Sequence, residues 1–227
     1  KQQLISKIER SYPMVSFVVP AYNEEKNIMR CLDSLFECAV NFRGSSEIIV
    51  IDDGSTDNTY EVAWATINFK HQKLAYIRAK VVRHTANLGK AEALRTGVNT
   101  AMGEYVAIVD ADTFWDPSGL TELVDYVYAT KTFAASGYIH PSDGISERKL
   151  FVILQQLEYS QGLGILRRAE ALGNGITVVP GPMGLYRSEV LRRLLNDKQA
   201  KSVTEDLELT LEMQKKKMKI GYDDDAR

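Results

Sequence analysis

Residues 105–112 read Tyr-Val-Ala-Ile-Val-Asp-Ala-Asp, and this stretch sets the architecture expected for the rest of the chain. The five residues before the first acid are apolar or aromatic and rich in β-branched types, and they are too few for a buried helix. They predict a central strand of a parallel sheet, covered on both faces. The strand runs into Asp110 and Asp112. Ligands bind at the carboxyl ends of the strands in open α/β sheets, so these two acids are candidates for a ligand site.

Two carboxylates one residue apart suggest a divalent cation. Hard oxygen ligands suit Mg²⁺ or Mn²⁺, and Mg²⁺ is commonly held by one or two protein carboxylates together with phosphate oxygens. The alternative is that Asp110 and Asp112 merely shape the loop into the next helix. Asp116-Pro117 already offers a start for that helix, as an N-cap followed by proline at the first helical position. Asp110 and Asp112 are therefore left for chemistry.

The composition predicts one globular α/β domain with a sizeable core, because the 227 residues have a net charge of −2 and are 44% hydrophobic. A charge so close to neutral argues against a nucleic-acid partner. Cys31 and Cys38 are seven residues apart in a helical pattern, which indicates reduced core thiols and no zinc site. No apolar run approaches the ~20 residues of a membrane span, so the chain as it stands is expected to be soluble.

The first half of the chain alternates strand and helix four times, which predicts a parallel sheet with right-handed crossovers. The first expected strand is closed by Pro20, and a short helix is expected over residues 1–10. The other expected helices cover about 24–40 and the segment from the turn at 87–90 to about 101. The expected strands cover residues 14–19, 47–51, the region of 81–82, and 105–109.

After Leu120 the regular alternation of strand and helix ends. Residues 133–139 predict a fifth strand, and residues 146–172 an unusually long helix. The strand-like segment 177–186 is interrupted by glycines and prolines, which implies that its backbone passes close to something. Ser188 and Thr204 are expected to open the last two helices, and residues 219–222 are expected to form a short edge strand.

Polar residues follow all four strands of the first half, and parallel strands bring their carboxyl ends to one edge of a sheet. The first strand is followed by Pro-Ala-Tyr-Asn-Glu-Glu and not by a glycine fingerprint, so this turn offers no amide cradle for a pyrophosphate. A cation on the two acids would neutralise the phosphates instead, and Lys90 could add positive charge. The converging segments are Pro20-Ala21-Tyr22-Asn23-Glu24, Asp52-Asp53, Asn87-Leu88-Gly89-Lys90 and Asp110-Ala111-Asp112.

Asp53 could accept a hydrogen bond from the imide of a base, and Tyr22 could lie against the ring. Each segment also has a simpler reading. Asp53-Gly54 suits a tight turn, residues 55–57 suit a helix cap, and residues 87–90 suit a turn that starts a helix.

The second half adds Thr204-Glu205-Asp206. Glu205 is explained by a capping box with Ser202, whereas the cap does not need Asp206. Leu207, Leu211 and Met218 are expected on the inward face of the helix. A carboxylate near the start of this helix is placed to take a proton from a hydroxyl group.

In order and spacing, five motifs resemble the signature of glycosyltransferase family two. They are Val-Val-Pro-Ala-Tyr-Asn-Glu-Glu (18–25), Val-Ile-Asp-Asp-Gly-Ser-Thr-Asp (50–57), Asn-Leu-Gly-Lys (87–90), Asp-Ala-Asp (110–112) and Thr-Glu-Asp (204–206). The last is similar to the membrane-bound branch that includes cellulose, hyaluronan and poly-N-acetylglucosamine synthases. The resemblance implies the GT-A fold, a Rossmann-like, mostly parallel sheet flanked by helices. It also implies a nucleotide-sugar donor, foremost a UDP-sugar, a Mg²⁺ or Mn²⁺ cofactor, and inversion at the anomeric carbon.

Carried over residue by residue, the resemblance assigns Asp110 and Asp112 to the metal and Asp206 to the catalytic base. A single domain is expected, with a nucleotide-sugar-binding half over about 14–130 and an acceptor half with its own helices over about 131–227. The residues expected to bind the donor are Pro20, Ala21, Tyr22, Glu24, Asp52, Asp53, Gly89, Lys90, Asp110 and Ala111.

Members of that branch continue from Thr-Glu-Asp into a Gln-x-x-Arg-Trp segment and membrane helices, and neither occurs before Arg227. The expectation is therefore a catalytic-domain fragment of a longer protein at the cytoplasmic face of a membrane, acting on a glycan or lipid acceptor. A non-catalytic nucleotide-sugar-binding or scaffold domain is the main alternative, but such a domain would have lost acids that are all present here. A nucleotidyltransferase would want a glycine-rich, basic first loop, and this loop is acidic.

Overall fold

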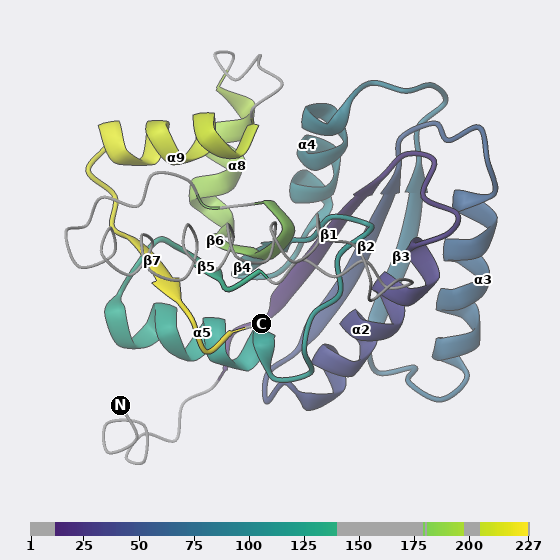
Figure 1. Ribbon diagram of the computed structural model, residues 1–227, viewed down its shortest axis with the longest axis horizontal. Coiled ribbons are helices and arrows are strands. Elements are labelled where there is room, and N and C mark those ends of the chain that lie inside the picture. Colours follow the sequence, from purple (N-terminus) through teal and green to yellow (C-terminus); the bar gives the residue numbers. More distant parts are fainter. Residues whose placement is uncertain (1–11, 140–178, 180, 198–204, 227) are drawn as a thin grey trace, which may run out of the picture.

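The computed structural model describes residues 12–139, 179, 181–197 and 205–226 (Figure 1). The helices expected over residues 1–10 and 146–172 lie outside the described residues, as do the expected cap residues Ser202 and Thr204. None of the described helices is both long enough and apolar enough to cross a membrane.

The described strands form one seven-stranded sheet in the order β3-β2-β1-β4-β6-β5-β7. β6 runs antiparallel to both of its neighbours, whereas the other pairs are parallel. This arrangement confirms the predicted mostly parallel α/β sheet, with the last strand at an edge. The strands are β1 (Val15–Ala21), β2 (Ser46–Asp52), β3 (Arg78–Arg83), β4 (Tyr105–Ile108), β5 (Ala134–Gly137), β6 (Gly184–Arg187) and β7 (Ile220–Asp223).

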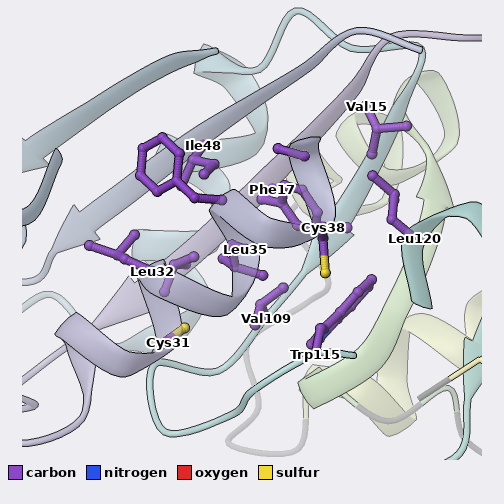
Figure 2. Close-up of a cluster of buried hydrophobic side chains, with 14 of the residues drawn as sticks. Val15, Phe17, Cys31, Leu32, Leu35, Cys38, Ile48, Val109, Trp115 and Leu120 are labelled. Carbon is purple, nitrogen blue, oxygen red and sulfur yellow. The ribbon is translucent and has the colours of Figure 1, made fainter. Parts of the chain in front are cut away.

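Helices cover both faces of the sheet, because neighbouring residues of each strand point to opposite sides (Figure 1). In β1, Phe17 packs with the residues of α2, whereas Val18 packs with those of α4. Figure 2 shows the first of these clusters, in which the rings of Phe17 and Trp115 are nearly perpendicular, with their centroids 5.6 Å apart. One face carries α2 (Ile28–Asn41), α3 (Thr59–His71) and α5 (Gly119–Thr130), and the other carries α4 (Lys90–Thr100), α8 (Ser188–Asn196) and α9 (Glu205–Lys215).

Pro20 lies inside β1 instead of ending it, which corrects the expected boundary. Val18 O accepts from Val109 N on the β4 side, and Ala21 O accepts from Asp53 N on the β2 side. Because successive residues alternate sides, the Pro20 nitrogen faces β4, beyond the point where that pairing ends at Val18. The missing N–H therefore costs the sheet no hydrogen bond.

The starts of two helices also differ from expectation. α5 begins at Gly119, and residues 116–118 form a turn in which Gly119 N donates to Asp116 O at 2.9 Å, so Asp116-Pro117 is not the helix start. α2 begins at Ile28 and not at Glu24, since the amides of Glu24 and its neighbours donate to side chains from the segment after β2. Tertiary partners, and not local propensity, set both boundaries.

Gly97 marks the closest approach of α4 to the sheet. A Cβ placed there would lie 2.3 Å from Val18 Cγ1, a stiff and fully buried branch. Overpacking costs about 1–3 kcal/mol, whereas alanine gains only about 1 kcal/mol over glycine in a helix. We therefore expect Gly97→Ala to lower the free energy of unfolding, measured by urea denaturation. Combining it with Val18→Ala should cost less than the sum of the two single changes, and a Gly97→Ala protein as stable as the parent would contradict the packing argument.

Candidate functional site

A cleft of about 360 Å³ opens at the carboxyl ends of β1, β2 and β4, beside the start of α4. β1 lies between β2 and β4, so the strands that follow β1 in sequence are added on both of its sides, and the strand order reverses at this point. Such switch points are where open α/β sheets bind ligands. The lining residues are Pro20, Ala21, Tyr22, Glu24, Asp53, Asn87, Gly89, Lys90, Ala93, Asp110, Ala111 and Asp112.

The loop after β1 is held by the segment after β2. Asn23 adopts a left-handed backbone with φ of 58°, and its amide donates to Ser55 Oγ at 3.0 Å. Glu24 N donates to Thr59 Oγ1 at 2.8 Å, and Glu25 N to Asp57 Oδ2 at 3.2 Å. These three amides are thus engaged within the protein and do not point a free N–H at a ligand. The Tyr22 side chain remains 45% exposed at the mouth of the cleft.

The helix cap expected from residues 55–57 is only partly present. The cap position of α3 is Asn58, whose side chain makes no capping hydrogen bond. Asp57 Oδ1 instead accepts from Thr59 N at 3.0 Å, while Oδ2 accepts from the loop after β1. The Asp57 carboxylate therefore links that loop to the first residue of α3.

Asp52 and Asp53 are adjacent but have different environments. Asp52 is fully buried, forms an ion pair with Arg83 Nε at 3.0 Å, and accepts from Ser55 N at 3.2 Å. It does not line the cleft, which corrects its assignment to the donor-binding residues. Asp53 does line the cleft, and its Oδ2 also accepts from Gly89 N at 2.8 Å, directly before the start of α4.

Gly54 allows the chain to bend directly after Asp53. Its φ is 68°, and a Cβ there would lie 2.4 Å from the carbonyl carbon of Ala86. Only glycine fits both the backbone angle and the contact. The turn expected at residues 53–54 is therefore present, and it leaves Asp53 at the cleft.

Asp110 and Asp112 stand where β4 meets its loop, as expected. Lys90 Nζ lies 2.7 Å from Asp110 Oδ1, which brings the start of α4 into contact with the acids. Among the described residues, no group of three or more His, Cys, Asp or Glu side chains is arranged to hold a metal. Two carboxylates are nevertheless a sufficient protein contribution for Mg²⁺ or Mn²⁺ when phosphate oxygens and water complete the shell. The carboxylates of Asp110 and Asp112 therefore fit such an ion, if a diphosphate supplies its other ligands.

The two cysteines lie behind this site and are confirmed as buried free thiols. Burial raises the pKa of the Cys31 thiol, and the negative charges of Asp112 and Asp110 raise it further. Burial likewise raises the pKa of Cys38 to about 12. Both side chains therefore stay neutral and serve as core residues, with Cys38 Sγ donating to Asp116 O at 3.1 Å.

Asp206 is the second residue of α9, and its side chain lies outside the part that the structure describes. The inward face of α9 is formed by Leu209, Thr210 and Met213, all buried, whereas Leu211 is 40% exposed. This corrects the expectation that Leu211 faces inward. Position 206 precedes Leu209 by three residues and Thr210 by four, so it belongs to the same face of the helix as these buried residues.

The glycines and prolines that were expected to interrupt a strand around residues 181–184 lie in a short 3₁₀ turn, η2 (Gly181–Met183), and at the start of β6. A Cβ at Gly184 would lie 2.7 Å from the Tyr186 ring, and Trp115 Nε1 donates to Pro182 O at 3.0 Å. The close approach inferred from the sequence is therefore made at least in part by aromatic side chains of the protein itself.

Sequence reasoning missed one residue at the cleft, His84, and one lining residue, Ala93. His84 Nδ1 lies 2.7 Å from Asp53 Oδ1. Its position directly after β3 was the available signal, because the carboxyl ends of β1 to β4 share this edge of the sheet.

Residues 16–195 match the sequence model of glycosyl transferase family 2, a span that includes every residue lining the cleft. The chain belongs to glycosyl transferase family 2. It is 30% identical over 179 residues to poly-beta-1,6-N-acetyl-D-glucosamine synthase of Staphylococcus epidermidis, covering 78% of this chain and 40% of that protein. It is 27% identical over 178 residues to hyaluronan synthase of Streptococcus pyogenes, covering 78% and 41%. The chain thus spans about two fifths of the length of these relatives.

Among solved structures, this family 2 chain is similar to a mannosyltransferase from Pyrobaculum calidifontis, solved in complex with GDP-Man and Mn²⁺. The TM-score is 0.70 at 22% identity, and the match covers 99% of this chain and 60% of the other. The likeness confirms the predicted Rossmann-like α/β fold.

Proposed function

We propose that this chain is the donor-binding and catalytic domain of an inverting, metal-dependent glycosyltransferase that takes a sugar from a UDP-sugar. The observation that carries the proposal is the cleft, where residues distant in sequence from β1, β2, α4 and β4 meet at one sheet edge. Its contents suit the parts of a nucleotide sugar. An exposed aromatic ring and a carboxylate suit the base, and a lysine with two carboxylates suits a cation-bound diphosphate.

Within this proposal the residues have distinct roles. Tyr22 offers its ring to the base, and Asp53 accepts from the base N–H. Lys90, now paired with Asp110, offers its charge to the diphosphate. A Mg²⁺ or Mn²⁺ ion held by Asp110 and Asp112 would supply positive charge that stabilises the leaving diphosphate.

The nucleotide-sugar half over about 14–130 contains every lining residue of the cleft. The remaining half is proposed to bind a glycan or lipid acceptor, with Asp206 as the base that removes the proton of its hydroxyl. The similarity to two polysaccharide synthases supports this reading. A longer protein held at the cytoplasmic face of a membrane belongs to the same proposal, and fractionation of the full-length protein tests it.

Calorimetric titration with UDP, GDP and dTDP and their sugars, each with Mn²⁺, tests the donor. We expect UDP and a UDP-sugar to bind most tightly. A preference for GDP would overturn the choice of base, and no binding of any nucleotide would overturn the proposed function. Binding without any turnover in the full-length protein would favour the scaffold alternative.

A further inference from the structure

His84 is a mostly buried histidine that joins the cleft to α4. Its side chain is 10% exposed, and its two ring nitrogens both have partners. Nδ1 lies 2.7 Å from Asp53 Oδ1, and Nε2 lies 3.0 Å from Thr96 Oγ1. A carboxylate only accepts, so Nδ1 carries a proton and donates it to Asp53. The imidazole is thus held at both ends.

The hydrogen bonds at Asp53 leave one acceptor position open. A carboxylate has about four lone-pair sites, two on each oxygen. Oδ1 accepts from His84 Nδ1 and from Leu88 N at 3.0 Å, whereas Oδ2 accepts only from Gly89 N at 2.8 Å. Within the described residues Oδ1 is therefore saturated, and Oδ2 keeps one site for a donor from the cleft.

These contacts fix the carboxylate as well as saturate it. Leu88 and Gly89 immediately precede α4, and Thr96 lies within that helix. Asp53 is therefore held to the segment directly before α4 and, through His84, to the second turn of that helix. The two backbone amides hold one oxygen each, and the imidazole adds a third contact, on Oδ1. A group held in one orientation binds a ligand with less loss of freedom.

We propose that His84 is a positioning residue for nucleoside recognition, which acts by holding Asp53 so that only Oδ2 receives the N–H of the base. This inference rests on the proposed function, because it takes the cleft to bind a nucleoside diphosphate. It assigns His84 no contact with the ligand. The chemistry that the arrangement selects is a base with a ring N–H donor, as in uracil, over one without it, as in cytosine.

The test measures UDP, CDP and Mn²⁺-pyrophosphate binding by calorimetry in the 227-residue chain and its variants. When Asp53 is no longer held, its Oδ2 loses the hydrogen bond from the base, and a hydrogen bond to a charged group is commonly worth about tenfold or more in affinity. His84→Phe should therefore weaken UDP binding by up to roughly that factor. Pyrophosphate binding should change little, because pyrophosphate has no base, and CDP binding should change less than UDP binding, because cytosine has no ring N–H to present to Oδ2. The preference for UDP over CDP should therefore narrow.

Three further variants separate positioning from general damage. His84→Asn keeps a donor close to the place of Nδ1 and should restore most of the UDP affinity. Thr96→Val removes the distant partner and should cause a smaller loss of the same selectivity. His71→Phe makes the same chemical change at the end of α3, where Nε2 faces Ile77 O at 3.1 Å, and should leave all three ligands unaffected.

The outcomes are distinguishable from failure of the proposed function. If the parent chain binds no UDP, the proposed function itself is wrong. If the parent binds UDP and His84→Phe binds it equally well, His84 positions nothing. Equal losses for UDP, CDP and pyrophosphate would show general damage to the cleft and also overturn the inference. Should His84→Phe fail to fold, Thr96→Val decides, since unchanged selectivity in that variant contradicts the relay.

Discussion

Asp206→Asn is expected to lower turnover of the full-length protein by about 10²–10⁴-fold, the usual contribution of a general base. Inverting transfer needs a group that removes the acceptor proton on the face of the sugar opposite the leaving diphosphate. Asp206 occupies the second position of α9, on the same helix face as the buried residues Leu209 and Met213. A position near the start of a helix suits such a base. Donor and metal affinity should be unchanged, because the donor cleft is lined by other residues.

Glu205→Gln is the matched control. Successive helical residues point about 100° apart, so Glu205 and Asp206 cannot share one role. We expect Glu205→Gln to cost at most on the order of 1 kcal/mol of stability, because glutamine can still close a capping box, with turnover largely kept. Both variants are measured for UDP affinity by calorimetry and for turnover by sugar transfer. If Asp206→Asn keeps more than about a tenth of the parent's turnover, below the smallest loss expected for a base, another group deprotonates the acceptor.

Asp112→Ala is expected to abolish the dependence of UDP affinity on Mn²⁺. Two neighbouring carboxylates and a diphosphate repel one another in a cleft of low dielectric unless a cation lies between them. Lys90 already neutralises Asp110 at 2.7 Å, so Asp112 is the acid whose charge most needs the ion. In the parent chain, removing Mn²⁺ with a chelator should weaken UDP binding at least about tenfold, which is ~1.4 kcal/mol. In Asp112→Ala the affinity should be equally low with and without Mn²⁺.

Asp116→Ala provides the control for charge. Asp116 is an exposed acid of the same loop that does not line the cleft, so its removal should leave the Mn²⁺ dependence intact. Thermal unfolding of both variants checks that the fold is kept. Equal UDP affinity of the parent chain with and without Mn²⁺ would refute the metal site on Asp110 and Asp112.

The placement of the cleft could be predicted from local sequence. Apolar runs such as residues 105–109 identify strands by their length and residue types, and parallel strands necessarily end at one edge. The polar residues after four such runs therefore had to meet, and eleven of the twelve residues that line the cleft, all but Ala93, lie in the segments that the sequence predicts to converge there. Glycosyl transferase family 2 was recognisable from the same motifs.

Helix boundaries could not be predicted in this way. The Asp116-Pro117 pair has the right residue types for a helix start, but residues 116–118 form a turn instead. The carbonyl oxygen of Asp116 accepts from Cys38 Sγ, which lies 78 positions away in the chain. The inward face of α9 also escaped prediction. Leu207 and Leu211 are as apolar as Leu209. Leu209 and Met213 are the buried residues because they pack into the cluster on the face of the sheet that also carries α4.

By itself, the sequence determined the α/β alternation, the edge at which the polar residues gather, and the acids that reach it, because hydrophobic periodicity and strand direction are local properties. The roles of the two neighbouring acids Asp52 and Asp53 depended on tertiary structure. Both are aspartates at the end of β2, yet Asp52 pairs with Arg83 in the interior, whereas Asp53 faces the cleft and accepts from His84. Each partner lies 31 residues further along the chain, at the end of β3. Only the pairing of β2 with β3 brings it within hydrogen-bonding distance.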